Sequence, residues 1–310
     1  MFFQTSRIDN FYERRDCIRG IIIKGVGGAY EIRLPDEEVV GGKPRGLFRN
    51  IGLVPTVGDQ VEIEESGDSD FPYTITEIMD RENILVRPPI SNLHTLIITV
   101  ACKMPAPDYT LIDKLLILCG NHSIHPIIWI TKTDLAPKVA EQLIKEYEQT
   151  RYCMITTGKE TDMSGILSDL QKNMPGKEEK IISFAGQSGV GKSTLCNALL
   201  NRNTMKVGTV SKKLKRGRHT TRHVELLPYP GGYIADTPGF SSLRLQDVGI
   251  EEKDVVYGYP ELQIMNEECR FQDCLHTGEA GCAVDTSFIN ENRLSRYREF
   301  VAQLQRVKKY

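Results

Sequence analysis

The stretch Gly186-Gln187-Ser188-Gly189-Val190-Gly191-Lys192-Ser193 decides the fold of this chain. It satisfies the phosphate-loop pattern, in which backbone N–H groups curl around phosphate oxygens and a helix N-terminus adds partial positive charge. The apolar run Ile181–Ala185 before it predicts a buried strand, and the residues from Lys192 onward predict a helix. We therefore predict that Lys192 contacts the β- and γ-phosphates and that Ser193 ligates Mg²⁺; an incidental Gly-rich turn is the alternative. The predicted nucleotide contacts here are Gly186, Gln187, Ser188, Gly189, Val190, Gly191, Lys192, Ser193 and Thr194.

A second motif, Asp236-Thr237-Pro238-Gly239, follows the apolar run Tyr233–Ala235. A carboxylate at the end of such a strand can hold Mg²⁺ through water, and the N–H of Gly239 can contact a γ-phosphate. Alone the motif is an ordinary turn, but downstream of a phosphate loop it indicates a nucleotide hydrolase.

The basic run Lys212–Arg222 lies between these two motifs. It contains adjacent threonines, and one hydroxyl can complete the Mg²⁺ shell together with Ser193 and Asp236. We favour Thr221 over Thr220, with exposed strand residues as the alternative. The charges of the run indicate either a solvated loop or a contact with RNA phosphates.

The base-reading motif is Thr131-Lys132-Thr133-Asp134, after the apolar run Ile127–Ile130. Its pattern is that of the guanine-reading Asn-Lys-x-Asp motif. The Asp134 carboxylate can accept from two guanine N–H groups, and the stem of Lys132 can cover the base. Because Thr131 replaces the usual Asn, we expect a weaker hydrogen bond between this motif and the phosphate loop. A strand end with a helix cap at Asp134 is the alternative.

The order of the motifs is unusual, since the base-reading motif precedes the phosphate loop. Thr156-Thr157-Gly158, which also lies upstream, could supply a backbone N–H to the guanine oxygen. Joining the old ends of a GTPase and cutting it elsewhere produces this order, and such permutation is tolerated when the termini are close together at the surface. The sequence thus predicts a circularly permuted P-loop GTPase domain.

Three domains follow from the pattern of elements. Residues 1–88 contain short alternating strands with Gly-rich turns, which indicate a small barrel such as an OB-fold. Residues 89–243 alternate strands and helices and predict the α/β GTPase domain, after a boundary at Pro88-Pro89. Residues 244–310 are helical and charged and contain a Cys/His cluster. The predicted fold class is multidomain α/β.

The cluster Cys269-x₄-Cys274-x-His276-x₅-Cys282 provides three thiolates and one imidazole. This is the ligand set of a closed, tetrahedral, structural Zn²⁺ site. A coincidence of free thiols is the alternative. The sequence therefore predicts one structural Zn²⁺ in addition to the Mg²⁺ that accompanies GTP.

The overall composition is that of an ordinary globular protein. The 310 residues are 40% hydrophobic and 26% charged, with a formal net charge of −2, so nucleic-acid contact requires local basic patches. No apolar run reaches the roughly 18 residues of a membrane span, and the start does not have the pattern of a signal peptide. We expect a cytoplasmic protein without a membrane partner. Its five scattered cysteines are then expected to be small buried residues: Cys17, Cys102, Cys119, Cys153 and Cys196.

Together, the barrel, the permuted GTPase motifs and the Cys/His cluster resemble the ribosome small subunit-dependent GTPase A (RsgA) family over nearly the whole chain. Gly217-Arg218-His219-Thr220-Thr221 resembles the switch signature of that family, and Gly281-Cys282-Ala283-Val284 resembles the end of its zinc motif. The resemblance implies an N-terminal OB-fold, a permuted G domain and a C-terminal zinc domain. It also implies GTP hydrolysis stimulated by the small ribosomal subunit and its rRNA, during late maturation of that subunit. We expect a monomer that binds GTP and GDP.

Hydrolysis needs a group that positions the attacking water. Ras-like enzymes place a Gln after Asp-x-x-Gly, but Phe240 occupies that position here. We predict slow intrinsic turnover and name His219 as a candidate catalytic residue, beside Lys192 and Thr221. A contact of His219 with RNA phosphate is the alternative.

Two further groups suggest RNA contact less strongly. The last helix carries a basic set interrupted by acids: Arg293, Arg296, Arg298, Arg306, Lys308 and Lys309 beside Glu291 and Glu299. In the barrel, Tyr30, Phe48 and Tyr73 could stack on bases, although core positions are favoured.

Two other functions remain possible from the sequence. One is an RNA-binding switch that uses GTP with negligible turnover. The other is a small-molecule kinase or ATPase, against which the guanine-reading Asp134 argues.

Overall fold

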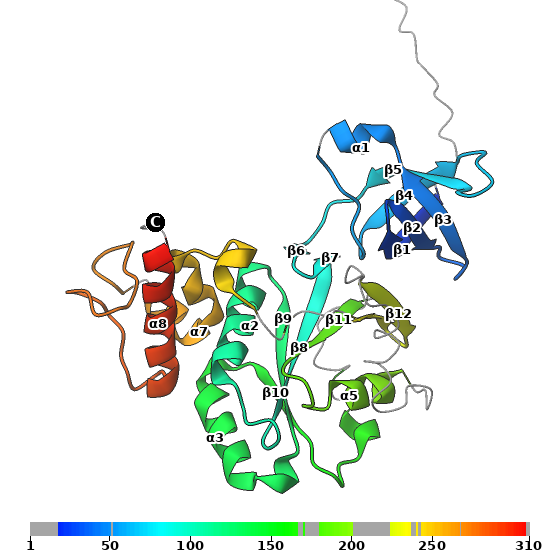
Figure 1. Ribbon diagram of the computed structural model, residues 1–310. Helices are drawn as coiled ribbons and strands as arrows, with labels where there is room; N and C mark the ends of the chain where they lie inside the picture. Colours follow the sequence, from blue (N-terminus) through cyan, green and yellow to red (C-terminus); the bar gives the residue numbers. More distant parts are fainter. Residues whose placement is uncertain are drawn as a thin grey trace, which may run out of the picture.

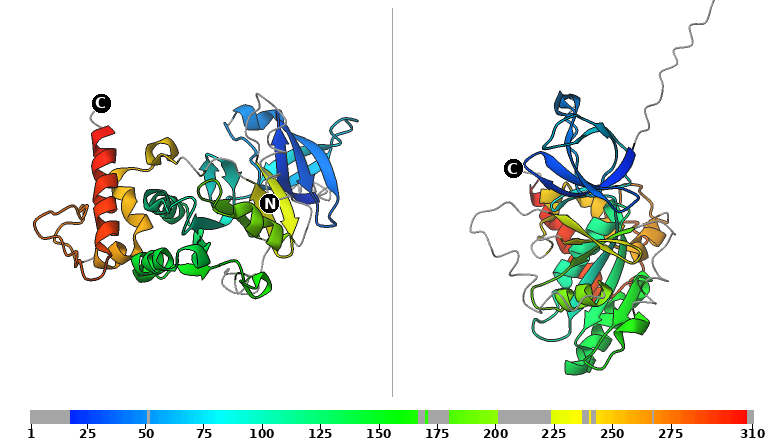
Figure 2. Two further views of the ribbon diagram at one scale, coloured as in Figure 1. Left: turned by 60° about the horizontal axis from the view of Figure 1, so that its bottom comes forward. Right: turned by 90° about the vertical axis from the view of Figure 1, so that its right-hand side faces the viewer.

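The computed structural model describes residues 18–50, 52–166, 170, 180–200, 224–236, 240, 243–266 and 268–307. Within these residues, eleven strands form one continuous sheet in the order β10-β9-β8-β11-β13-β12-β1-β2-β3-β5-β4. The N-terminal barrel lies at one end of the molecule and the last helix at the other, with the α/β unit between them (Figure 1, Figure 2). The predicted multidomain α/β fold class is confirmed.

The barrel closes because β1 pairs with both β2 and β4. Its elements are β1 (Ile18–Val26), β2 (Ala29–Arg33), β3 (Val39–Pro44), α1 (Gly46–Asn50), β4 (Gln60–Glu65) and β5 (Tyr73–Ile78). Sequence patterns did not predict β3, since it contains two glycines and a proline, which strands disfavour. Phe48 is buried, and Tyr30 and Tyr73 pack against the barrel core, which agrees with the core interpretation of these aromatics.

A small hairpin joins the barrel to the central unit. It consists of β6 (Ile84–Val86) and β7 (Pro89–Ser91), so Pro89 is part of a strand within the predicted boundary. The barrel loop at Gly58 rests directly on this hairpin, because a Cβ at Gly58 would lie 2.2 Å from the carbonyl oxygen of Ser91. Only glycine permits this approach.

The central unit has a sheet whose five parallel strands carry the predicted site at their C-terminal ends. The parallel strands are β8 (Leu93–Ala101), β9 (His125–Thr131), β10 (Cys153–Thr156), β11 (Lys180–Ala185) and β13 (Gly232–Asp236), and β12 (Glu225–Tyr229) is antiparallel to β13. Side chains that alternate along β8 enter two different cores: Ile98 packs with α2 (Tyr109–Asn121) and α3 (Pro137–Tyr147), and Ile97 packs with α5 (Lys192–Leu199). These helices therefore cover opposite faces of the sheet.

The helix predicted from Pro137 toward Tyr152 ends earlier, at Tyr147, and continues as the 3₁₀ turn η2 (Glu148–Thr150). Arg151 then adopts a left-handed conformation with φ of 58°, which ends the helical path. The helix predicted over residues 164–173 lies largely outside the described residues.

No helix in the described part of the chain has the length and apolar character of a membrane span.

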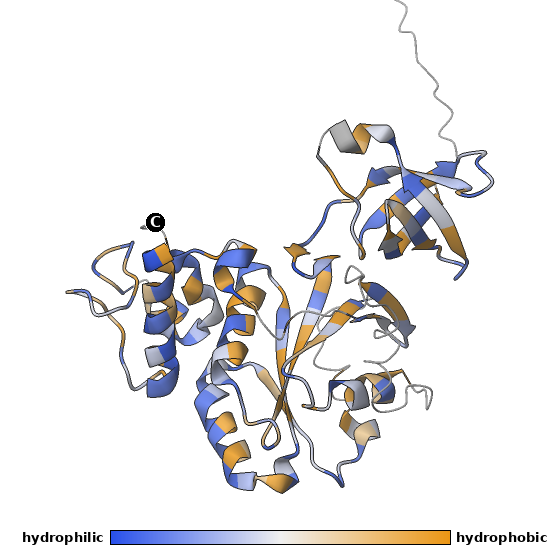
Figure 3. Ribbon diagram, in the orientation of Figure 1, coloured by the Kyte–Doolittle hydropathy of each residue, from blue (hydrophilic) through white to orange (hydrophobic). Residues whose placement is uncertain are grey.

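The C-terminal unit docks on α2. It contains η4 (Leu245–Val248), η5 (Glu252–Gly258), α7 (Pro260–Asn266) and α8 (Glu291–Val307). Much of α8 is hydrophilic (Figure 3), yet its Leu294, Tyr297 and Phe300 enter a core that also includes Ile117 of α2. The backbones of α2 and η5 approach so closely that a Cβ at Gly120 would lie 1.9 Å from the carbonyl oxygen of Tyr257.

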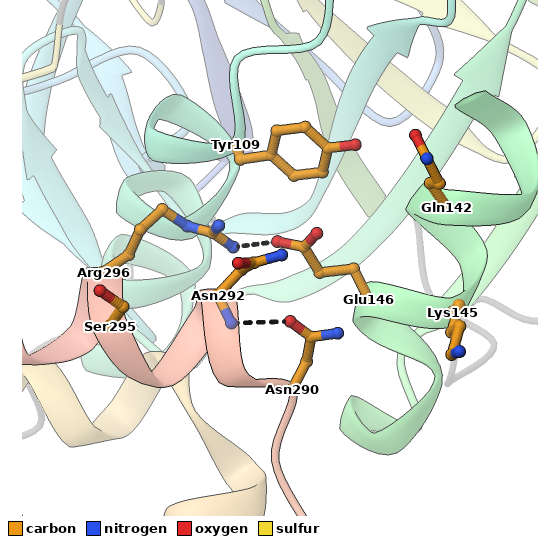
Figure 4. A pocket seen from close by; sticks show the side chains of 8 residues that line it. All are labelled: Tyr109, Gln142, Lys145, Glu146, Asn290, Asn292, Ser295 and Arg296. Carbon is orange, nitrogen blue, oxygen red and sulfur yellow. Dashed lines mark hydrogen bonds and ion pairs between the residues drawn. The ribbon is translucent and has the colours of Figure 1, made fainter.

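A buried ionic network fastens α8 to the central unit. Asp113 of α2 is fully buried and pairs with both Arg293 and Arg296, and Arg293 Nε lies 2.7 Å from Glu261 Oε1. Arg296 also pairs with Glu146 of α3, across a pocket between α3 and α8 (Figure 4). The prediction that Arg293 and Arg296 contribute to a basic RNA-binding patch is therefore wrong, because both are neutralised inside the protein.

Candidate nucleotide site and metal centre

The predicted phosphate loop connects β11 to α5 and has the backbone shape that phosphate binding requires. Gly186, Gly189 and Gly191 have φ values of 131°, 83° and 106°, which only glycine adopts readily. A Cβ at Gly186 would also lie 2.1 Å from the carbonyl oxygen of Thr99 in β8. Ser193 and Thr194 lie in the first turn of α5, where free N–H groups and the helix dipole favour an anion.

Lys192 lies over this loop. Its Nζ donates to the carbonyl oxygens of Gly186 at 2.8 Å and Gln187 at 2.6 Å. Burial lowers the pKa of the Lys192 ammonium group. A partly buried cation within the curl of the loop is suited to a phosphate ligand, which would supply the opposite charge.

The base-reading motif meets the phosphate loop through two side chains. The Thr131 hydroxyl donates to the carbonyl oxygen of Val190 at 2.7 Å, and Lys132 Nζ donates to that of Gly189 at 2.8 Å. Lys132 also donates to the carbonyl oxygen of Met104, in the loop after β8. We expected the hydrogen bond from Thr131 to the phosphate loop to be weaker than one from Asn. This hydrogen bond is present and has a normal length.

Asp134 faces the loop that follows β10. It lies in the 3₁₀ turn η1 (Thr133–Leu135), and its Oδ1 accepts from the Lys159 N–H at 3.1 Å. The following helix α3 begins at Pro137 without a side-chain cap, so the described contacts do not support a helix-capping role for Asp134. A pocket opens here, lined by Thr133, Asp134, Pro137, Ala140, Gly158, Lys159, Glu160 and Thr161. The loop at Thr156-Thr157-Gly158 therefore lies beside Asp134, as its proposed role in guanine binding requires.

Asp236 ends β13 on the phosphate side of the site. Burial, and secondly the charge of Glu225, raise the pKa of its carboxyl group. Burial, and secondly the charge of Asp236, raise the pKa of Cys196 to about 11, and Cys196 lies on α5 three residues after Ser193. The carboxylate of Asp236 and the hydroxyl of Ser193 are hard oxygen donors of the kind that Mg²⁺ prefers.

The Cys/His cluster comes together as its spacing predicted. His276 Nδ1 lies 3.6, 3.7 and 3.5 Å from the Sγ atoms of Cys269, Cys274 and Cys282. Bond lengths of about 2.3 Å to sulfur and 2.0 Å to nitrogen in a tetrahedron give N···S edges of about 3.6 Å. The four side chains can hold one metal ion.

A carboxylate that is not one of the four ligands shapes the loop that carries them, residues 269–282, which we call the metal loop. Glu279 accepts from the N–H groups of Leu275, Thr277 and Gly278 at 3.0, 2.7 and 3.1 Å. Burial raises the pKa of Glu279, but backbone hydrogen bonds outweigh it and lower the pKa to about 2. Sequence reasoning did not identify Glu279 as a residue that shapes this loop. The available signal was that Glu279 is the one acidic residue between the ligands His276 and Cys282.

The comparisons with known proteins bear on the whole arrangement. The profile of the family described as RsgA GTPase matches residues 78–246, and that of the RsgA N-terminal domain matches residues 19–70. A protein of Ruminiclostridium cellulolyticum named small ribosomal subunit biogenesis GTPase RsgA is 39% identical over 94% of this chain and 95% of its own length. A Bacillus velezensis protein of the same name is 37% identical over 93% and 98%. This chain belongs to the RsgA GTPase family.

Solved structures support this membership. The crystal structure of YjeQ from Thermotoga maritima is similar with a TM-score of 0.75 and 28% identity, over 93% of this chain and 99% of that one. The structure of YloQ, described as a circularly permuted GTPase, gives a TM-score of 0.74 and 29% identity over 95% and 97%. The permuted order of motifs predicted from the sequence thus agrees with the description of this structural neighbour.

Some predicted site residues lie outside the described residues of this RsgA family member. They are His219, Thr220, Thr221, Gly239 and the rest of the basic run. The site described above therefore rests on the phosphate loop, the base-reading motif, Asp236 and the Cys/His cluster.

Proposed function

We propose that this chain hydrolyses GTP as a late maturation factor of the small ribosomal subunit. The observation that carries the proposal is the direct contact between the base-reading motif and the phosphate loop, through Thr131 and Val190. A nucleotide bound along this contact would have its guanine at Asp134 and its phosphates in the curl of Gly186–Ser193. The names of the relatives supply the ribosomal part of the proposal.

Each residue has a proposed role in this reaction. Asp134 reads guanine, the loop after Thr156 supplies an N–H to the base, and Lys192 holds the β- and γ-phosphates. Ser193, Asp236 and Thr221 are proposed to hold Mg²⁺, which would neutralise charge that develops on the phosphates. Gly239 is proposed to contact the γ-phosphate, and His219 to position the attacking water.

We further propose that the Cys/His cluster holds a structural Zn²⁺. All four donors converge, so together they would fill the four coordination positions of a tetrahedral Zn²⁺ and leave none for a substrate. The three-domain division at residues 1–88, 89–243 and 244–310, a monomeric state, contact with rRNA and a cytoplasmic location are also part of the proposal. The rival function is a GTP-dependent RNA-binding switch with negligible turnover.

The decisive experiment measures turnover of GTP and ATP by the purified protein, with and without purified small ribosomal subunits. Slow intrinsic GTP turnover and strong, GTP-specific stimulation by the subunit are expected. Nucleotide binding without stimulated turnover would favour the switch.

Asp134→Asn tests base recognition in the same assay. Because an amide can pair with the extra oxygen of xanthine, the variant should prefer XTP to GTP. Unchanged GTP preference, or efficient use of ATP by the wild type, would contradict the guanine-reading role of Asp134.

A further inference from the structure

A row of charged residues crosses four neighbouring strands, from the barrel to the metal side of the nucleotide site. The strands are β2, β1, β12 and β13, which are adjacent in the sheet in that order. The Cα register pairs Glu31 with Lys24, Lys24 with Glu225, and Glu225 with Asp236. Directly opposed residues place their side chains on one face of a sheet, within reach of each other. The row therefore reads acid, base, acid, acid and ends at Asp236.

Lys24 is shared between the two units of the protein. Its Nζ lies 3.5 Å from Glu31 of the barrel and 3.6 Å from Glu225 of the central unit. Within the described residues, the register between β1 and β12 consists of the single pair Lys24 and Glu225. The sheet contact that carries this ion pair is therefore narrow.

Glu225 in turn acts on Asp236. Like charges that face each other across two strands repel. Asp236 is also partly buried, which disfavours its charge further. A divalent cation at Asp236 would relieve both effects. The negative charge of Glu225 attracts that cation, whereas the positive charge of Lys24 repels it.

On the basis of the proposed Mg²⁺-dependent GTPase function, we propose that Glu225 is a positioning residue that strengthens divalent-cation binding beside Asp236, and that Lys24 of the barrel weakens it. The barrel thereby sets the cation affinity of the nucleotide site through one ion pair.

The test follows the release of a fluorescent GDP analogue from the full-length protein as Mg²⁺ is titrated, without hydrolysis. Glu225→Gln should need about three- to tenfold more Mg²⁺ for half-maximal slowing of release, and Lys24→Met about two- to fivefold less. Glu31→Gln is the matched control, since it removes the same charge from the other partner of Lys24. It should stay within about twofold of the wild type, because Glu31 is two strands farther from Asp236.

Further outcomes separate the possible failures. Lys24→Arg keeps the charge and should keep the wild-type Mg²⁺ requirement, and all shifts should shrink at high salt. An unchanged requirement in Glu225→Gln, or equal shifts in Glu225→Gln and Glu31→Gln, would overturn the inference. A shift of Lys24→Met toward more Mg²⁺ would overturn the role of Lys24. A wild type whose GDP release does not respond to Mg²⁺ would also overturn the inference, whereas an absence of GTP turnover in the ribosome-stimulated assay would overturn the proposed function.

Discussion

A single hydroxyl group joins base recognition to phosphate binding in this protein. Thr131 is buried and donates to the Val190 carbonyl oxygen, at the position that Asn occupies in the guanine-reading pattern Asn-Lys-x-Asp. The shorter side chain reaches because β9 ends beside the phosphate loop. The same hydroxyl also lies 3.3 Å from the carbonyl oxygen of Val100. Loss of the hydroxyl would leave a buried carbonyl oxygen without this partner.

We expect Thr131→Val to weaken GDP binding about five- to thirtyfold. The change keeps the shape but removes the donor, and a lost buried hydrogen bond costs about 1–2 kcal/mol. Titration with a fluorescent GDP analogue measures the effect. Thr131→Ser, which keeps the hydroxyl, should bind nearly as the wild type does; equal losses in both variants would show that packing, not the hydrogen bond, matters here.

Side chains of α8 hold the metal loop by hydrogen bonds to its backbone. Tyr297 of α8 donates from its hydroxyl to the carbonyl oxygen of Leu275 at 2.9 Å, and Arg298 donates to that of His276 at 3.3 Å. The loop has little hydrophobic core of its own, so the metal is expected to supply much of its stability. The same helix carries Arg293 and Arg296 into the central unit.

We expect removal of the metal with a strong chelator to expose the amides of residues 269–282 and of the facing turns of α8 to hydrogen exchange. Wild-type protein should contain about one zinc per chain. Cys282→Ser should lose most of this zinc, whereas Cys196→Ser, which changes a thiol outside the cluster, should retain it. Equal zinc content in the two variants would rule out the proposed ligand set.

At the scale of the whole molecule, buried charges join the C-terminal unit to the central unit. Arg293 is fully buried between Asp113 and Glu261, with its guanidinium over the rings of Tyr147 and Tyr259. Such a network is costly to desolvate, and it holds only while every partner is present. Since its members come from α2, α3, α7 and α8, separating the units would expose all of them together.

We expect Arg293→Met to lower the free energy of unfolding by about 3–5 kcal/mol, because Asp113 and Glu261 lose their buried partner. Urea unfolding followed by circular dichroism measures this change. The matched control is Arg19→Met, which removes the same group from an exposed ion pair with Glu62 and should cost less than about 1 kcal/mol. Similar losses in the two variants would contradict a special role of the buried network.

Local sequence determined the parts of this protein whose chemistry lies within one short segment. The phosphate loop, Thr131–Asp134 and the cluster Cys269–Cys282 are such segments, since glycine conformation, strand ends and ligand spacing act over a dozen residues or so. The same reasoning predicted the barrel, the parallel sheet and the permuted order. It did not predict β3 and placed the end of α3 too late, because the pairing of β3 and the turn at Arg151 depend on neighbours that local propensity does not include.

Only the tertiary structure decided which charged and polar groups meet. Arg293 and Asp113 are 180 residues apart, and Thr131 and Val190 are 59 apart. A sequence pattern assigns Arg293 to a solvated basic face, because burial of a charge is favourable only where distant helices bring its partners. Lys24 and Glu225 likewise meet only because the barrel lies beside β12. Their ion pair depends on how the units are joined, and no single segment contains that information.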